Sequence, residues 1–219
     1  MAIEAVVWDF GGVFTTSPFE AFNRYEASRG LPKDLIRTVN ATNPLENAWA
    51  LFERAEIDRS GFDLKFLEES TALGHPVRGA DVLPLLSGDV RPRMVEALRL
   101  CKRHFKVACI TNNMAQGHGP GMAASAEGAS RSAGIMALFD VIVESSKAGI
   151  RKPDPRIYQI ACEKLGVAPA ACVYLDDLGV NCKPAAELGM RAIKVLTEAQ
   201  ALDDLAAATG LVFPEAVAA

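Results

Sequence analysis

The sequence lacks several features that mark particular classes of protein. It has no apolar run of the roughly 18 to 20 residues needed to cross a bilayer, and its amino terminus does not have the layout of a signal peptide. Its net charge of -4 gives no electrostatic reason to expect nucleic acid as a partner. Internal repeats and low-complexity segments are also missing. We therefore expect a cytoplasmic protein that binds neither membranes nor nucleic acid.

Histidine and cysteine are too scattered to suggest a metal cluster. The three histidines are His75, His104 and His118, and the five cysteines include no closely spaced pair of ligands. Cys109 and Cys172 fall inside apolar runs that are typical of strands. The cysteines are therefore predicted to be buried, reduced thiols.

What the sequence does contain is an apolar run that leads directly into an acid. Residues 5–8 are apolar, Asp9 follows at once, and Gly11-Gly12 then allow the backbone to turn. Open parallel sheets bind their ligands at the carboxyl ends of their strands, which is where this pattern puts Asp9. Taken alone, an Asp beside Gly-Gly is more typical of a residue that caps a turn.

Four further apolar runs also end in polar residues. They lie at residues 107–111, 139–143, 172–175 and 192–196. Segments with helical periodicity separate several of them, at residues 92–103, 155–165 and 183–188. This alternation predicts an α/β fold with a doubly wound parallel sheet. The polar strand ends then meet at one edge of the sheet, which brings together Asp9, Thr111, Asp176 and Asp177.

The segment 17–87 breaks this alternation and has mostly helical patterns. The expected helices lie at residues 19–29, 33–40, 44–54 and 62–73. Half of the 219 residues are apolar, which is enough for a large core and a small lid. We therefore expect an α/β core domain made of residues 1–16 and 88–219, and a helical domain made of residues 17–87.

Three details of this layout stay open at the level of sequence. The aromatic side chains of the helical segment either line a ligand site or form that segment's own core; they are Trp49, Phe52, Phe62 and Phe66. Residues 83–93 are predicted to be the linker that returns to the core. Residues 116–134 are rich in Gly, Ala and Ser and are predicted to form a mobile loop beside Thr111.

Four separated motifs resemble those of the haloacid dehalogenase (HAD) superfamily. They are Asp9 after the first strand, Thr111 at the end of another, Lys152 in Arg-Lys-Pro-Asp-Pro, and the Asp176-Asp177 pair followed by Asn181. The phrases WDFGGV, RKPDPRIY and YLDDLGVNCKPAAELGM are most similar to the branch that includes the amino-terminal phosphatase domain of soluble epoxide hydrolases. The resemblance implies a HAD-like Rossmannoid core with a small all-helical cap inserted after the first strand.

The resemblance also implies an activity and a metal. It implies a hydrolase of the Mg²⁺-dependent phosphomonoesterase type that acts on a small phosphorylated metabolite, as a monomer or homodimer. Asp9 would be the nucleophile that forms an aspartyl-phosphate. Asp9, Asp177 and the Gly11 carbonyl would bind Mg²⁺, and Asp176 would support this shell through water or a hydrogen bond.

The remaining motif residues would bind the phosphoryl group. Thr111 offers a hydroxyl, the backbone amides from Asn112 onward offer donors, and Lys152 offers a positive charge. Asn181 would orient Lys152 or the acids. Each position also has an ordinary structural explanation: Thr favours strands, a Lys before Pro is usually solvated, and paired Asp residues often cap turns or helices.

Position 11 departs from the common phosphatase pattern, which has a second Asp two residues after the nucleophile. Gly11 cannot donate a proton to the leaving group, and general acid catalysis contributes about two to four decades in rate. Glu46, Glu53 and Asp58 are candidates for an acid supplied by the cap. Two alternatives follow: a 2-haloacid dehalogenase in which Asp9 attacks carbon, and a phosphate-ligand binding module with attenuated catalysis.

Overall fold

A five-stranded, fully parallel sheet forms the centre of the chain. In this computed structural model, which describes residues 2–114 and 126–213, the strand order is β3-β2-β1-β4-β5. The strands are β1 (Ala5–Trp8), β2 (Lys106–Thr111), β3 (Val141–Glu144), β4 (Cys172–Asp176) and β5 (Arg191–Lys194). The predicted α/β class and parallel sheet are therefore confirmed, because each predicted apolar run overlaps one of these strands to within one or two residues.

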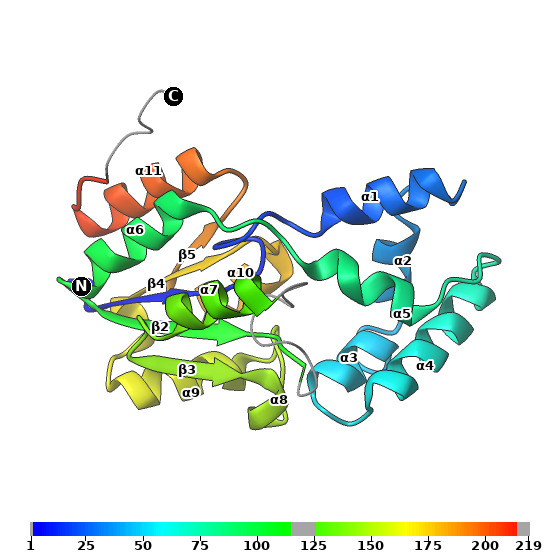
Figure 1. Cartoon of the computed structure of the whole chain (residues 1–219). Helices are drawn as coiled ribbons and strands as arrows, with labels where there is room; N and C mark the ends of the chain where they lie inside the picture. The colour runs from blue at the N-terminus through cyan, green and yellow to red at the C-terminus, as the bar shows by residue number, and fades with distance from the viewer. Residues whose placement is uncertain (1, 115–125, 214–219) are drawn as a thin grey trace, which may run out of the picture.

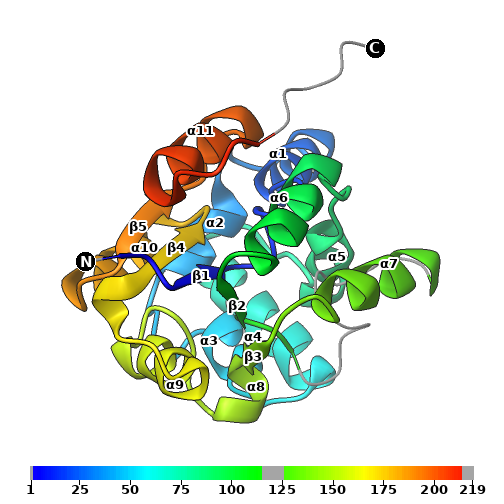
Figure 2. The ribbon, with the colours of Figure 1, turned by 90° about the vertical axis from the view of Figure 1, so that its left-hand side faces the viewer.

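Helices cover both faces of the sheet, so its strands are buried on two sides (Figures 1 and 2). On one face lie α6 (Pro92–Lys102), α7 (Ala126–Met136) and α11 (Glu198–Thr209). On the other face lie α9 (Pro155–Leu165) and α10 (Gly179–Glu187). A short helix, α8 (Ser145–Ala148), follows β3, and a 3₁₀ turn, η2 (Pro169–Ala171), precedes β4. Among the residues that the structure describes, no helix is long and apolar enough to cross a membrane.

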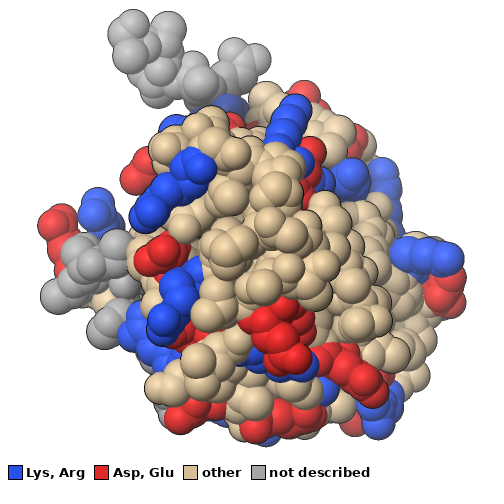
Figure 3. Space-filling view, turned by 90° about the vertical axis from the view of Figure 1, so that its right-hand side faces the viewer, with Lys and Arg blue, Asp and Glu red and all other residues tan. Residues whose placement is uncertain are grey.

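A helical unit is inserted between β1 and α6, as predicted. It comprises α1 (Phe19–Ser28), α2 (Leu35–Ala41), α3 (Ala48–Glu53), α4 (Arg59–Ala72), α5 (Gly79–Val82) and the 3₁₀ helix η1 (Leu83–Leu86). We call Phe19–Leu86 the helical insert. Figure 3 shows its outer face, where acidic and basic side chains are intermixed and do not form a field of one sign.

The aromatic side chains of the insert form its own core. Trp49 and Phe62 have ring centroids 4.8 Å apart, and Phe52 stacks on Phe62 at 4.9 Å. Phe66 is fully buried in the same cluster. Such ring pairs stabilise a core beyond the area that they bury. Of the two interpretations left open above, the one that assigns these aromatics to the insert's core is confirmed.

Two chain segments that connect the insert to the sheet run side by side. Thr15 and Val90 form an antiparallel bridge, and the Thr16 N–H donates to the Asp89 carbonyl at 2.8 Å. A Cβ atom at Gly88 would lie 2.5 Å from the Thr16 carbonyl oxygen, so this close approach requires glycine. These two hydrogen-bonded segments are the covalent connections between the insert and the core domain.

Several predicted boundaries were wrong. Residues 83–86 belong to η1, so the returning linker begins only after Leu86. The expected loop at 116–134 is helical from Ala126 onward, and its portion 116–125 lies outside the described residues. The helix expected from Pro44 begins only at Ala48, because the Asn47 side chain caps it by accepting from Ala50 N–H.

Candidate functional site

The strand register brings the predicted motif residues to one edge of the sheet. Trp8 at the end of β1 lies opposite Leu175 of β4 and Cys109 of β2. Asp9 therefore follows β1 at the level of Asp176, and Thr111 ends β2 close by. This is the carboxyl edge of the sheet, where parallel α/β folds bind ligands.

Lys152 lies at the centre of this group. Its Nζ atom is 2.7 Å from Asp9 Oδ1 and 2.8 Å from Asp176 Oδ2, and its side chain is 1% exposed. The solvated alternative for this lysine is therefore wrong. Since a buried charge is costly unless it is paired, the two carboxylates are what allow the ammonium group to stay here.

Asp176 is fully buried, and its carboxylate oxygens accept from a closed shell of donors. Besides Lys152, these donors are the Tyr174 hydroxyl at 2.5 Å, the Asn181 amide at 3.1 Å and the Leu178 N–H at 2.8 Å. Asn181 lies in the first turn of α10, which begins at Gly179 and not at 183 as predicted. Asp176 thus positions Lys152 and the start of α10, while its oxygens face donors on all sides.

Asp177 turns toward the loop that follows β1. A Cβ atom at Gly12 would lie 2.2 Å from Asp177 Oδ2, and the Ser17 hydroxyl is 3.5 Å from the same oxygen. Asp9, Asp176 and Asp177 each bring one oxygen atom within 4.8 Å of those of the other two. The sequence motif therefore assembles into a compact cluster of three carboxylates.

Burial and mutual repulsion shift the ionisation of this cluster. Burial raises the pKa of Asp9 well above its usual value against the opposing charge of Lys152, and Asp176 and Asp177 raise it further. Burial and Asp176 raise the pKa of Asp177 to about 6. For Lys152, burial lowers the pKa, but Asp176 and Asp9 raise it by more, so the ammonium form is retained.

The donor set of the cluster suits a hard divalent cation. Three carboxylates face one lysine, so full ionisation leaves an excess of negative charge, and this excess adds to burial in raising the pKa values of Asp9 and Asp177. Mg²⁺ prefers oxygen ligands and usually keeps several waters. Asp9 and Asp177 offer such oxygens, whereas those of Asp176 already accept hydrogen bonds.

Asn112, which we predicted to bind substrate, has a second task in the structure. Its side-chain amide donates to the Lys152 carbonyl at 3.1 Å and accepts from the Lys152 N–H at 2.9 Å. This pair of hydrogen bonds fixes the main chain that carries the central lysine. Thr111, beside it at the end of β2, is 4% exposed.

The three candidate acids of the insert lie in different surroundings. Asp58 caps α4 by accepting from Gly61 N–H at 2.7 Å. Glu46 is exposed, and Glu53 forms an ion pair with Arg151 of the core at 2.6 Å. Among the described residues, Glu53 is the one of these three acids that pairs with Arg151, the residue before Lys152.

Two residues near the cluster were missed from the sequence. Tyr174 lies two residues before Asp176 on the same strand, and side chains two apart share a face, so this signal was available. Arg91 offers no comparable local signal. Its charge lowers the pKa of Asp177, and its buried Nη1 atom has no hydrogen-bond partner among the described residues.

Comparison with known proteins gives this geometry a context. The family described as haloacid dehalogenase-like hydrolase matches residues 3–189. Phosphatase MT3486 of Mycobacterium tuberculosis is 32% identical over 212 residues, which cover 93% of this chain and 92% of that protein. Bifunctional epoxide hydrolase 2 of Mus musculus is 29% identical over 235 residues, which cover 99% of this chain and 40% of that protein. The chain therefore spans less than half the length of several curated relatives that it matches.

Solved structures share the fold. A HAD family enzyme from Bacteroides thetaiotaomicron, in complex with magnesium and inorganic phosphate, has a TM-score of 0.56 and 18% identity, covering 88% of this chain and 94% of that one. L-2-haloacid dehalogenase from Xanthobacter autotrophicus has a TM-score of 0.60 and 21% identity, covering 97% of this chain and 85% of that one. At these identities the likeness concerns the fold alone.

Proposed function

Because this chain belongs to the haloacid dehalogenase-like hydrolases, we propose that it is a Mg²⁺-dependent phosphomonoesterase acting on a small phosphorylated metabolite. The observation that carries the proposal is the position of Lys152, whose Nζ atom bridges Asp9 and Asp176 beside Asp177. A nucleophile, a fixed positive charge and two further carboxylates are what the hydrolysis of a phosphate dianion requires. A relative named as a phosphatase matches almost end to end, which supports the same class of substrate.

Asp9 is the proposed nucleophile. Its Oδ1 atom accepts from Lys152 and from the Phe10 N–H at 2.7 Å, which leaves Oδ2 to attack phosphorus. The new bond joins Oδ2 to phosphorus as the bond from phosphorus to the ester oxygen breaks. The ester oxygen departs with its electron pair and, with no acid at position 11, takes its proton from solvent water. Water then attacks the aspartyl-phosphate, which releases inorganic phosphate and restores the carboxylate.

Asp9, Asp177 and the Gly11 carbonyl are the proposed ligands of Mg²⁺, with Asp176 supporting them from outside the shell. When bound, the ion neutralises the carboxylates and the phosphoryl oxygens. Thr111, the backbone amide of Asn112 and Lys152 are the proposed phosphate-binding groups. The Asn112 side chain contributes by holding the main chain of Lys152.

The helical insert is the proposed cap. We assign residues 17–87 to it and residues 1–16 and 88–219 to the core domain. Its own apolar cluster, to which Met114 is the one buried contribution from the described part of the core, and its paired connecting segments support this division. The five described cysteines are buried free thiols, which supports a reducing, cytoplasmic setting, with the chain acting as a monomer or homodimer.

An assay with p-nitrophenyl phosphate tests the proposal. Hydrolysis should require added Mg²⁺, stop with a chelator, and fall by about three decades or more in Asp9→Asn, which removes the nucleophile at nearly constant volume. The variant should remain folded and unfold cooperatively on heating, so that the loss of activity reports on the nucleophile. Turnover retained in Asp9→Asn would contradict the covalent mechanism.

A parallel assay with a 2-haloacid tests the main alternative. The fold neighbour named as a haloacid dehalogenase motivates it. Release of halide without added metal, together with absent phosphatase activity, would reassign Asp9 to attack on carbon. Binding of Mg²⁺ and inorganic phosphate without turnover of any ester would instead favour a binding module.

A further inference from the structure

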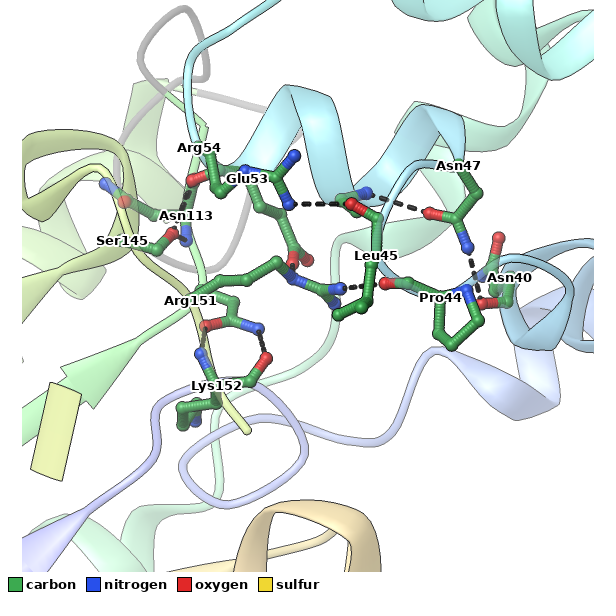
Figure 4. Close-up of polar contacts among 12 residues, drawn as sticks. Asn40, Pro44, Leu45, Asn47, Glu53, Arg54, Asn113, Ser145, Arg151 and Lys152 are labelled. Atoms are coloured by element: carbon green, nitrogen blue, oxygen red, sulfur yellow. Dashed lines mark hydrogen bonds and ion pairs between the residues drawn. The ribbon is translucent and has the colours of Figure 1, made fainter. Parts of the chain in front are cut away.

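The helical insert contacts the core at a second place besides its paired connecting segments. At the end of α3, Arg151 Nε of the core lies 2.6 Å from Glu53 Oε2, and Arg151 Nη1 donates to the Pro44 carbonyl at 3.1 Å (Figure 4). The two side chains of the ion pair are only 22% and 12% exposed. Partial burial reduces solvent screening, so this pair is stronger than a typical surface pair.

A buried serine adds to the same contact. The Ser145 hydroxyl donates to the Glu53 carbonyl at 2.7 Å and accepts from the Asn113 N–H at 3.0 Å. Asn113 in turn binds the Ser146 N–H through its side-chain carbonyl at 3.2 Å. The end of α3 is therefore held through its side chain by Arg151 and through its main chain by Ser145 of α8, which the loop after β2 binds in turn.

This contact lies next to the proposed catalytic lysine in the chain. Arg151 precedes Lys152, whose main chain Asn112 holds with two hydrogen bonds. Asn113, which reaches α8, directly follows Asn112. Contacts thus connect Glu53 to the loop that carries Lys152, through Arg151, and to the loop that follows Thr111, through Ser145 and Asn113.

We propose that Glu53, Arg151 and Ser145 form a latch that holds the insert closed over the carboxylate cluster. This proposal rests on the proposed phosphatase function. Glu53 and Arg151 are positioning residues, and their ion pair determines the fraction of enzyme molecules in which the insert is closed. The paired segments at Thr15 and Val90 stay intact as the hinge when the latch opens. Opening breaks one ion pair, a few hydrogen bonds and the apolar contact of Met114 of the core with the insert's cluster, but it leaves the core beneath the sheet whole.

The insert offers a matched control pair. Arg54 Nε lies 2.6 Å from Glu56 Oε1, and Arg54 Nη1 donates to the Leu45 carbonyl at 3.0 Å (Figure 4). This arrangement repeats the contacts of Arg151 with Glu53 and Pro44, but both partners belong to the insert. Glu56→Gln therefore removes the same kind of ion pair without releasing the insert from the core.

Hydrogen exchange on the full chain tests the latch without relying on turnover. Glu53→Gln should speed exchange of the Asn113 and Ser146 amides by about tenfold, whereas Glu56→Gln should change it by less than about twofold. Arg151→Lys keeps the charge but loses the planar guanidinium group that binds Glu53 and Pro44 together, so it should give an intermediate exchange rate. Exchanging the charges in Glu53→Arg with Arg151→Glu should restore most of the protection that either single change removes.

Steady-state kinetics then connect the latch to the reaction. Glu53→Gln should raise KM severalfold with a smaller change in kcat, because fewer molecules are closed before substrate binds, and Glu56→Gln should leave both parameters unchanged.

Equal exchange rates in Glu53→Gln and Glu56→Gln, or no restoration by the charge exchange, would overturn the latch. A wild-type chain without phosphatase activity would contradict the proposed function, and the exchange result would still decide the latch. If Glu53→Gln does not fold, Glu53→Asp, which keeps the charge on a shorter side chain, gives the same readout.

Discussion

Gly12 and Asp177 approach each other so closely that any side chain at position 12 would collide with the carboxylate. A Cβ atom there would lie 2.2 Å from Asp177 Oδ2, and the backbone of Gly12 has φ of +72°, which disfavours other residues. Gly11, its neighbour, lies outside this left-handed region, and a Cβ atom there would meet no atom within 4 Å. The two adjacent glycines therefore have different structural roles.

Alanine substitutions should separate these two roles. Gly12→Ala should push Asp177 away and strain the loop by about 1 kcal/mol or more, so Mg²⁺ affinity and phosphatase rate should both fall by about tenfold or more. Gly11→Ala should leave Mg²⁺ affinity within about twofold of the wild type, because its Cβ has room. Titration calorimetry and rates at saturating Mg²⁺ measure both effects. Equal losses in the two variants would show that the loop moves away from Asp177 in solution.

The two neighbouring aspartates should respond differently to amidation. Asp177→Asn should weaken Mg²⁺ binding more than Asp176→Asn, because the oxygens of Asp176 already accept from Lys152, Tyr174 and Asn181. Asp176→Asn should instead lower the melting temperature, since it removes one of the two charges that compensate buried Lys152. Calorimetry with Mg²⁺ and thermal unfolding without it measure the two effects. The reverse order of Mg²⁺ affinities would place Asp176 in the metal shell.

The raised pKa of Asp177 predicts how stability depends on pH in the absence of divalent cations. Its value of about 6 in the folded state exceeds the unfolded value of about 3.9, so the folded state binds the proton more tightly. The stabilising contribution of the protonated group is complete below about pH 4 and is lost as pH rises through about 6. Asp9 is shifted in the same direction.

Asp177→Asn should remove this loss, so the variant should gain stability relative to the wild type between pH 4 and 7, by about 3 kcal/mol at most. Urea unfolding with chelator present, compared between the two proteins at each pH, isolates this group from the other carboxylates. Added Mg²⁺ at pH 7.5 should raise the melting temperature of the wild type and have little effect on the variant. A difference in stability that does not change with pH would contradict the raised pKa.

Gly11 predicts a dependence on the leaving group. Without an acid at this position, aryl phosphates should be hydrolysed faster than alkyl phosphates by about two to four decades, because poor leaving groups need a proton. Gly11→Asp should reduce that difference, and a Cβ atom at this position would meet no atom within 4 Å. Gly11→Asn is the matched control, since it has the same shape without the acid. Similar rates for both ester classes in the wild type would mean that another residue already donates the proton.

The sequence by itself determined the strands and three of the helices that pack on them, α6, α9 and, except for its first turn, α10. Strands buried on both faces appear as continuous apolar runs, and β1 and α9 have the predicted bounds. It also determined that the helical segment lies between β1 and α6, because the strand-helix alternation stops there. The motif residues were found because polar side chains end apolar strands, and the ends of parallel strands meet at one edge.

Short and capped elements were decided by contacts that have no local pattern. Helices α5 and α8 have four residues each, which is too short for a helical period to appear. Helix α10 begins at Gly179 because Asn181 and the Leu178 N–H bind buried Asp176, a contact that the sequence pattern of 179–182 does not reveal. By contrast, Thr197 and Gln200 form a capping box at the start of α11, and their spacing in the sequence is typical of a helix start.

Only the tertiary structure decided which charged side chains form ion pairs with one another. Lys152 and Asp9 are 143 positions apart in the numbering, yet they form the central ion pair. Glu53 and Arg151 are separated by 98 positions, and the fold alone reveals that an acid considered as a proton donor forms an ion pair with the core. Local propensity and periodicity report on neighbours within a few residues, whereas burial, charge pairing and close approach depend on which segments the folded chain packs together.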